Sequence, residues 1–95
     1  MSKRKKLLER IRRNPRNVSF EDLITLLNYY GFDLIRSKGS HRSFKGLVGG
    51  QAFLLTVPYK RPLQAIYVKQ ALSLVERVIA ERELDEDEDD ETDNE

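Results

Sequence analysis

The spacing of the apolar residues changes twice along this chain, and these changes limit the folds that it can adopt. Between Phe20 and Leu27, apolar residues recur at the i, i+3, i+4, i+7 spacing of a buried helical stripe. After Gly31 the period becomes two, which predicts a half-buried strand with Phe32 and Leu34 on its inner side. From residue 64 to residue 82 the helical period returns. The apolar stripe of this last helix comprises Val68, Ala71, Leu72, Val75, Val78 and Ile79.

Cap and turn residues separate further elements. A helix predicted over residues 3–13 ends at Asn14-Pro15, and Ser19 is a good N-cap for the next helix. Glycines 39, 46, 49 and 50 indicate the hairpin connections between strands at 32–36, 41–45 and 52–57. The predicted order is helix–helix–strand–strand–strand–helix, an α+β fold with a three-stranded antiparallel sheet and helices packed on one face. The aromatic residues expected in its core are Phe32, Phe44, Phe53 and Tyr67.

The charges are segregated along the chain, although the formal net charge is only +1. All 17 Lys and Arg lie in residues 1–84 together with seven acids, whereas residues 85–95 (DEDEDDETDNE) hold nine acids and no base. A strongly basic domain most often binds nucleic acid, and an acidic protein partner is the other option. The acidic segment has too little apolar content to fold alone, so we expect it to be disordered. It would either keep the protein soluble or compete with nucleic acid for the basic face.

Several classes of protein are excluded by composition. The absence of cysteine excludes a disulfide scaffold, a thiol nucleophile and Cys-ligated zinc, and one histidine does not favour a histidine metal site. We therefore expect no cofactor. No apolar run approaches the roughly 20 residues that span a bilayer, so no membrane contact is predicted. The first residues, MSKRKK, lack the apolar core of a signal peptide, and we expect a cytoplasmic protein.

The single histidine, His41, lies in the sequence Gly39-Ser40-His41-Arg42, which is rich in cations on both sides. Imidazole exchanges protons near neutral pH, and the neighbouring cations would attract a phosphate backbone. No other segment combines an acid–base group with an anion-binding setting, so His41 is the candidate catalytic residue. The residues predicted to contact RNA are Arg36, Lys38, Gly39, Ser40, Arg42, Lys45, Lys60 and Arg61.

Three motifs together resemble the HicA toxin family. They are LITLLNYYGFDL over residues 23–34, IRSKGSHRSF over residues 35–44, and LLTVP over residues 54–58, and the similarity extends over about residues 19–78. The resemblance implies a fold like the double-stranded RNA-binding domain and membership of a type II toxin–antitoxin pair. It also implies an mRNA-cleaving endoribonuclease with His41 as its catalytic residue and a HicB-like antitoxin as its protein partner.

The chain departs from the family pattern at two places. Many members carry a histidine shortly after the Val-Pro, where this chain has Tyr59-Lys60. The basic helix and the acidic segment lie outside the family core. We therefore divide the chain into a basic N-terminal helix with linker (1–18), an α-β-β-β-α domain (19–84) and an acidic tail (85–95).

The expected chemistry needs no metal. Neutral His41 would act as general base on the ribose 2′-OH, which then attacks the adjacent phosphorus, and nearby cations would stabilise the phosphoryl charge. Tyr59, Lys60 or water would protonate the leaving oxygen. Two alternatives remain open: a non-catalytic RNA-binding module of the same fold, and a basic adaptor for an acidic protein.

Overall fold

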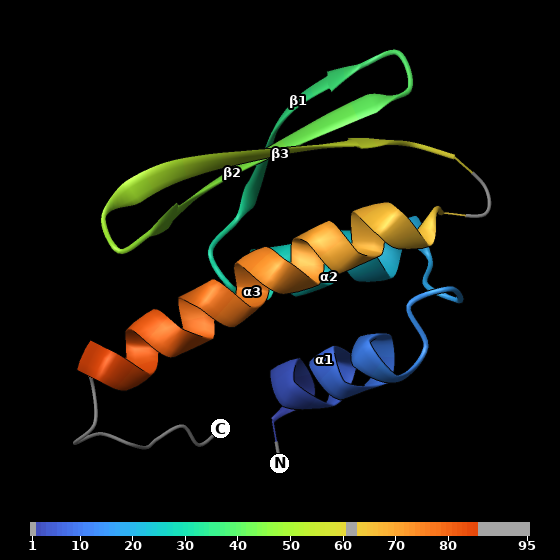
Figure 1. Cartoon of the computed structure of the whole chain (residues 1–95). Coiled ribbons are helices and arrows are strands. Elements are labelled where there is room, and N and C mark those ends of the chain that lie inside the picture. The colour runs from blue at the N-terminus through green and yellow to red at the C-terminus, as the bar shows by residue number, and fades with distance from the viewer. Residues whose placement is uncertain (1, 61–62, 86–95) are drawn as a thin grey trace.

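The computed structural model describes residues 2–60 and 63–85 and has the predicted order of elements (Figure 1). The predicted α+β class is confirmed. The elements are α1 (Lys3–Arg13), α2 (Phe20–Tyr29), β1 (Asp33–Lys38), β2 (His41–Val48), β3 (Gln51–Pro58) and α3 (Ala65–Asp85).

The three strands form an antiparallel meander in the order β1-β2-β3. β2 is the central strand, and its pairing with β3 is continuous from His41↔Pro58 to Val48↔Gln51. Gly39 (φ +58°) lies in the turn between β1 and β2, and Gly49 (φ +60°) and Gly50 (φ +81°) form the turn between β2 and β3. These left-handed conformations favour glycine, so the predicted hairpin signals are confirmed there.

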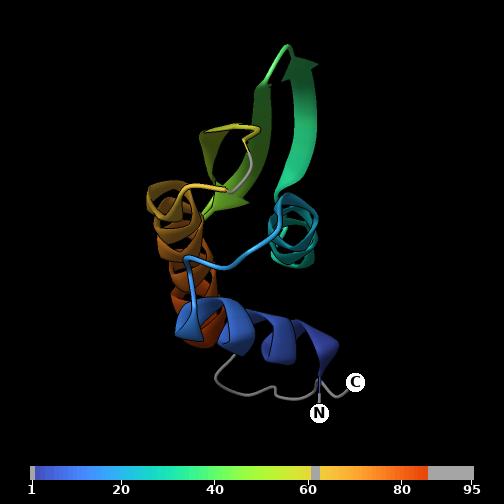
Figure 2. The same cartoon turned by 90° about the vertical axis from the view of Figure 1, so that its right-hand side faces the viewer.

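The molecule has three layers. The sheet lies on α2 and α3, and α1 lies on the opposite side of these two helices (Figures 1 and 2). A single core connects the layers. The buried residues from the sheet include Phe44, Leu55 and Val57, those from α2 and α3 include Leu23, Leu27, Val68 and Val75, and α1 contributes Leu7, Leu8 and Ile11.

Local contacts explain where α2 begins and ends. The Ser19 hydroxyl accepts a hydrogen bond from the backbone N–H of Asp22 at 3.1 Å, as expected of an N-cap. At the other end Gly31 has φ +89°, and the N–H of Phe32 returns to the carbonyl of Leu27 at 2.8 Å. The chain can therefore leave the helix directly into the sheet while Phe32 stays fully buried.

The prediction of a half-buried first strand is wrong beyond Phe32. All six residues of β1 are exposed, including Leu34 at 41%. The register shifts between Leu34 and Arg36, so Ile35 is an extra residue that breaks the period of two. The β1–β2 hairpin also extends away from the helices, so that no helix covers this strand's far half (Figure 2).

The ends of other elements differ slightly from the predictions. β2 continues to Val48, and α3 continues to Asp85, which the sequence assigned to the acidic tail. The predicted disorder of residues 86–95 and the predicted RNA contact of Arg61 fall outside the described residues. Within the described ranges, no helix combines the length and apolar character needed to cross a bilayer.

Candidate nucleic-acid interface

His41 is the first residue of β2, where the chain leaves the β1–β2 turn. In the strand register it lies opposite Lys38 on β1 and Pro58 on β3. The even-numbered residues Phe44, Gly46 and Val48 of this strand are buried toward the helices. Because strand side chains alternate between the two faces, His41 lies on the face that the helices do not cover. We call this the open face.

The register defines rows of side chains across the open face. The row of Lys38, His41 and Pro58 is followed by one of Arg36, Ser43 and Thr56, and then by one of Asp33, Lys45 and Leu54. Directly opposed residues in a sheet have Cβ atoms about 4.5–5.5 Å apart. The structure therefore brings together His41 and three predicted RNA contacts, Arg36, Lys38 and Lys45. All four side chains are exposed.

Arg42 lies on the opposite face of the sheet, the one that the helices cover, and its side chain supports the β1–β2 turn. Its guanidinium donates to the carbonyl of Gly39 at 2.8 Å and to that of His41 at 3.3 Å. The same group lies 5.1 Å from the centre of the Tyr59 ring, which packs on Phe20 with a centroid distance of 4.8 Å. These contacts hold the backbone of the turn and of His41 itself, so the geometry favours a positioning role for Arg42.

The end of β3 is joined to the same turn. The backbone N–H of Tyr59 donates to the carbonyl of Ser40. This hydrogen bond places Tyr59 next to the Gly-Ser-His segment, and the exposed Lys60 follows one residue later. The two predicted site segments, 36–45 and 59–60, thus meet at one end of the sheet.

One functional candidate was not predicted from the sequence. The hydroxyl of Ser43 lies 3.2 Å from that of Thr56, in the row next to His41. These hydroxyls can donate to phosphate oxygens beside the imidazole. The pattern Leu54-Leu55-Thr56-Val57 indicates an outward threonine, but its partner across the sheet follows only from the register.

The open face can bind a phosphodiester and exchange a proton with it. Lysine and arginine side chains attract phosphate without reading sequence, and a neutral imidazole accepts a proton from a nearby hydroxyl. Asp33 is the one acid in these rows, and it lies opposite Lys45 in the strand register. The side chains are exposed, so their electrostatic effect is weaker than in a closed, water-poor cleft.

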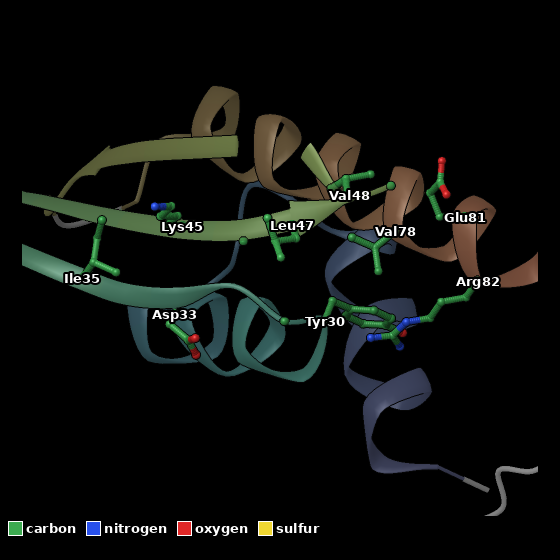
Figure 3. A pocket seen from close by; sticks show the side chains of 13 residues that line it. Tyr30, Asp33, Ile35, Lys45, Leu47, Val48, Val78, Glu81 and Arg82 are labelled. Carbon is green, nitrogen blue, oxygen red and sulfur yellow. The ribbon is translucent and has the colours of Figure 1, made fainter. Parts of the chain in front are cut away.

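A separate groove of about 940 Å³ lies between the far end of β2, the turn after α2 and the last turns of α3 (Figure 3). β1 pairs with β2 only as far as Lys45. Beyond that residue, the side of β2 that faces away from β3 has no strand partner, and it lines the groove. Tyr30 and Arg82 lie side by side at its wall. Burial raises the pKa of Tyr30, against the lowering effect of Arg4 and Arg82.

Comparisons with protein-family models, with curated proteins and with solved structures found no match to this chain. In the described part of the chain, no three side chains of His, Cys, Asp or Glu gather closely enough to hold a metal ion.

Proposed function

We propose that this protein is a HicA-like toxin, a small endoribonuclease that binds mRNA through the open face and cleaves it with His41. The observation that carries the proposal is the position of His41. It is an exposed imidazole in one row with Lys38, and Arg36 and Lys45 flank it on the same face. The order of the strands and of α3 after α2 is also the order that the resemblance implies.

In the proposed reaction, neutral His41 removes the proton from a ribose 2′-OH. The oxygen attacks the adjacent phosphorus, and the bond to the 5′-oxygen of the next nucleotide breaks, leaving a cyclic phosphate and a 5′-hydroxyl. Lys38 and Arg36 stabilise the charge on the phosphoryl oxygens, and water protonates the leaving oxygen. Positioned proton transfer of this kind contributes roughly 10²–10⁴-fold.

A non-catalytic RNA-binding module is the second candidate. The observation that favours it is the packing of Tyr59, the residue after the Val-Pro. Its ring lies between Phe20 and Arg42. That packing does not favour the phenol as the acid of a two-group mechanism. In this case the same surface would hold RNA without cutting it.

The test compares the wild type with His41→Ala on one structured and one single-stranded RNA. The imidazole is exposed and outside the core, so the variant should fold and retain most of the RNA affinity. Cleavage should fall by at least about 100-fold, because alanine cannot relay a proton. Leu47→Ala, on the same face of β2 but outside the rows assigned to RNA, is the matched control and should retain cleavage. A folded His41→Ala protein that cuts at the wild-type rate would refute the catalytic role, and two inactive proteins that bind RNA would favour the module.

The proposed protein partner is a HicB-like antitoxin. Expression of the wild type in a bacterium should arrest growth and degrade mRNA, and expression of His41→Ala should do neither. An antitoxin encoded by the neighbouring reading frame should restore growth when it is co-expressed. Continued arrest in its presence would exclude that protein as the neutralising partner.

A further inference from the structure

The N-terminal turn of α1 carries an unbalanced charge. It consists of Lys3, Arg4, Lys5 and Lys6 and contains no acid. The N-terminus of a helix already bears a partial positive charge, so acids stabilise this position and cations destabilise it. In the described part of the chain, the ion pairs of α1 involve Arg10 and Arg12, and none involves the three lysines. This turn therefore favours a nearby anion.

The contacts of α1 show which part of the molecule lies beside this turn. Arg12, near the end of α1, donates to Glu76 of α3 at 2.8 Å. Arg4, near its start, lies 5.5 Å from the Tyr30 ring centre, and Arg82 of α3 lies 5.6 Å from the same centre. α1 thus runs antiparallel to α3, and its basic start lies near Arg82, in the C-terminal part of α3. Figure 3 shows Arg82 against Tyr30 at this junction.

The chain supplies an anion at the same junction. α3 ends at Asp85, and the ten residues that follow contain eight acids. Ten extended residues reach about 33 Å, whereas the 11 residues of α1 are about 16 Å long. The segment is therefore long enough to lie along α1. Acids at the C-terminus of a helix are unfavourable, because that end of the helix dipole is negative. Contact between the acidic segment and α1 would offset this repulsion and also the repulsion of cations at the start of α1.

We propose that the acidic segment, residues 85–95, docks on the basic N-terminal turn of α1, with Lys3, Lys5 and Lys6 as its main partners. α1 and the sheet lie on opposite sides of the α2–α3 layer (Figure 2). The docked segment therefore covers α1 and leaves the open face and His41 free for RNA. Tethering supplies an effective concentration in the millimolar range, so weak contacts suffice. This inference does not rest on the proposed nuclease activity.

The first test is a thermal unfolding comparison at low salt with full-length proteins. In one variant the nine acids of the segment are replaced by their amides. Its Tm should be lower than that of the wild type by roughly 4 °C, a difference that disappears at high salt because exposed charges are screened. The amide replacement should have no effect in a Lys3→Gln, Lys5→Gln, Lys6→Gln background. It should keep its full effect in the matched Arg36→Gln, Lys38→Gln, Lys45→Gln background.

The second test locates the contact by comparing backbone amide NMR shifts of the wild type and the amide variant. Differences should cluster in residues 3–13 and spare residues 36–45. Differences in residues 36–45 would mean that the segment covers the open face, and an absence of differences outside the segment would mean that it docks nowhere. Either result overturns the proposal. Differences that grow with protein concentration would overturn it too, because the segment would then bind a second copy.

Discussion

At the scale of single residues, Gly46 shows what the sequence alone could not indicate. The pattern predicts a hairpin glycine, but Gly46 lies inside β2 and faces the core. A Cβ at this position would come within 2.7 Å of Cδ2 of Phe32 and within 2.9 Å of the carbonyl oxygen of Gly31. The residue is therefore required by the close approach of Phe32, a contact between segments that the local pattern does not contain.

Gly46→Ala should lower the free energy of unfolding by about 1–3 kcal/mol, because an added methyl overpacks a filled core. Urea denaturation measures the change. In a Phe32→Leu background, where the smaller side chain leaves more room, Gly46→Ala should lower the free energy of unfolding by less. The close contact with the carbonyl of Gly31 remains in that background. An unchanged free energy of unfolding for Gly46→Ala would show that Phe32 moves aside freely.

Tyr30 should make stability depend on pH in alkaline solution. Burial raises the pKa of its phenol in the folded state, so the neutral form stabilises the fold. This stabilisation is fully present below the ordinary tyrosine pKa of about 10 and is lost as the pH rises through the folded-state value. The wild type should therefore lose stability more steeply above pH 10 than Tyr30→Phe. Parallel curves for the two proteins in pH-dependent urea denaturation would contradict the burial of this hydroxyl.

At the scale of elements, the sequence predicted the helices better than the first strand. Cap and stop residues such as Ser19 and Gly31 act locally, and the helical stripes repeat over several turns, so both signals survive in the fold. The exposure of β1 depends on how far the helices extend beneath the sheet and on the extra residue at Ile35. Neither of these is encoded locally. The cation-rich turn at His41 was predicted from the sequence. The face of the sheet on which Arg42 lies and the pairing of Ser43 with Thr56 follow only from the strand register.

α1 contributes buried residues to the core, although most of its residues are charged. Ile11 is only 1% exposed and lies in the same cluster as Leu23. Ile11→Ala should lower the free energy of unfolding by about 2–5 kcal/mol, comparable to Leu23→Ala, within one cooperative transition. Glu9→Ala, on the exposed side of α1, is the control and should change stability by less than about 0.5 kcal/mol. A separate early transition in the Ile11 variant would instead identify α1 as an independent unit.

At the scale of the whole molecule, the basic charge is divided between two surfaces. The open face carries Arg36, Lys38 and Lys45 around His41, and α1 carries its lysines on the opposite side of the α2–α3 layer (Figure 2). A rigid duplex cannot lie on both sides at once. The acidic segment is joined to the end of α3, beside α1, so intramolecular pairing should leave the open face as the surface available to RNA.

The salt dependence of RNA binding should distinguish these two surfaces. Each neutralised phosphate contributes about −0.7 to the log–log slope of affinity against salt on single-stranded RNA. The triple variant Arg36→Gln, Lys38→Gln, Lys45→Gln should therefore reduce the magnitude of the slope by about 2 relative to the wild type. The matched variant Lys3→Gln, Lys5→Gln, Lys6→Gln should leave the slope nearly unchanged, because in the proposed arrangement those lysines are paired with the acidic segment and not with RNA. Fluorescence anisotropy with one labelled RNA at several salt concentrations measures all three slopes. An effect confined to the α1 variant would move the RNA-binding surface to α1 and separate it from His41.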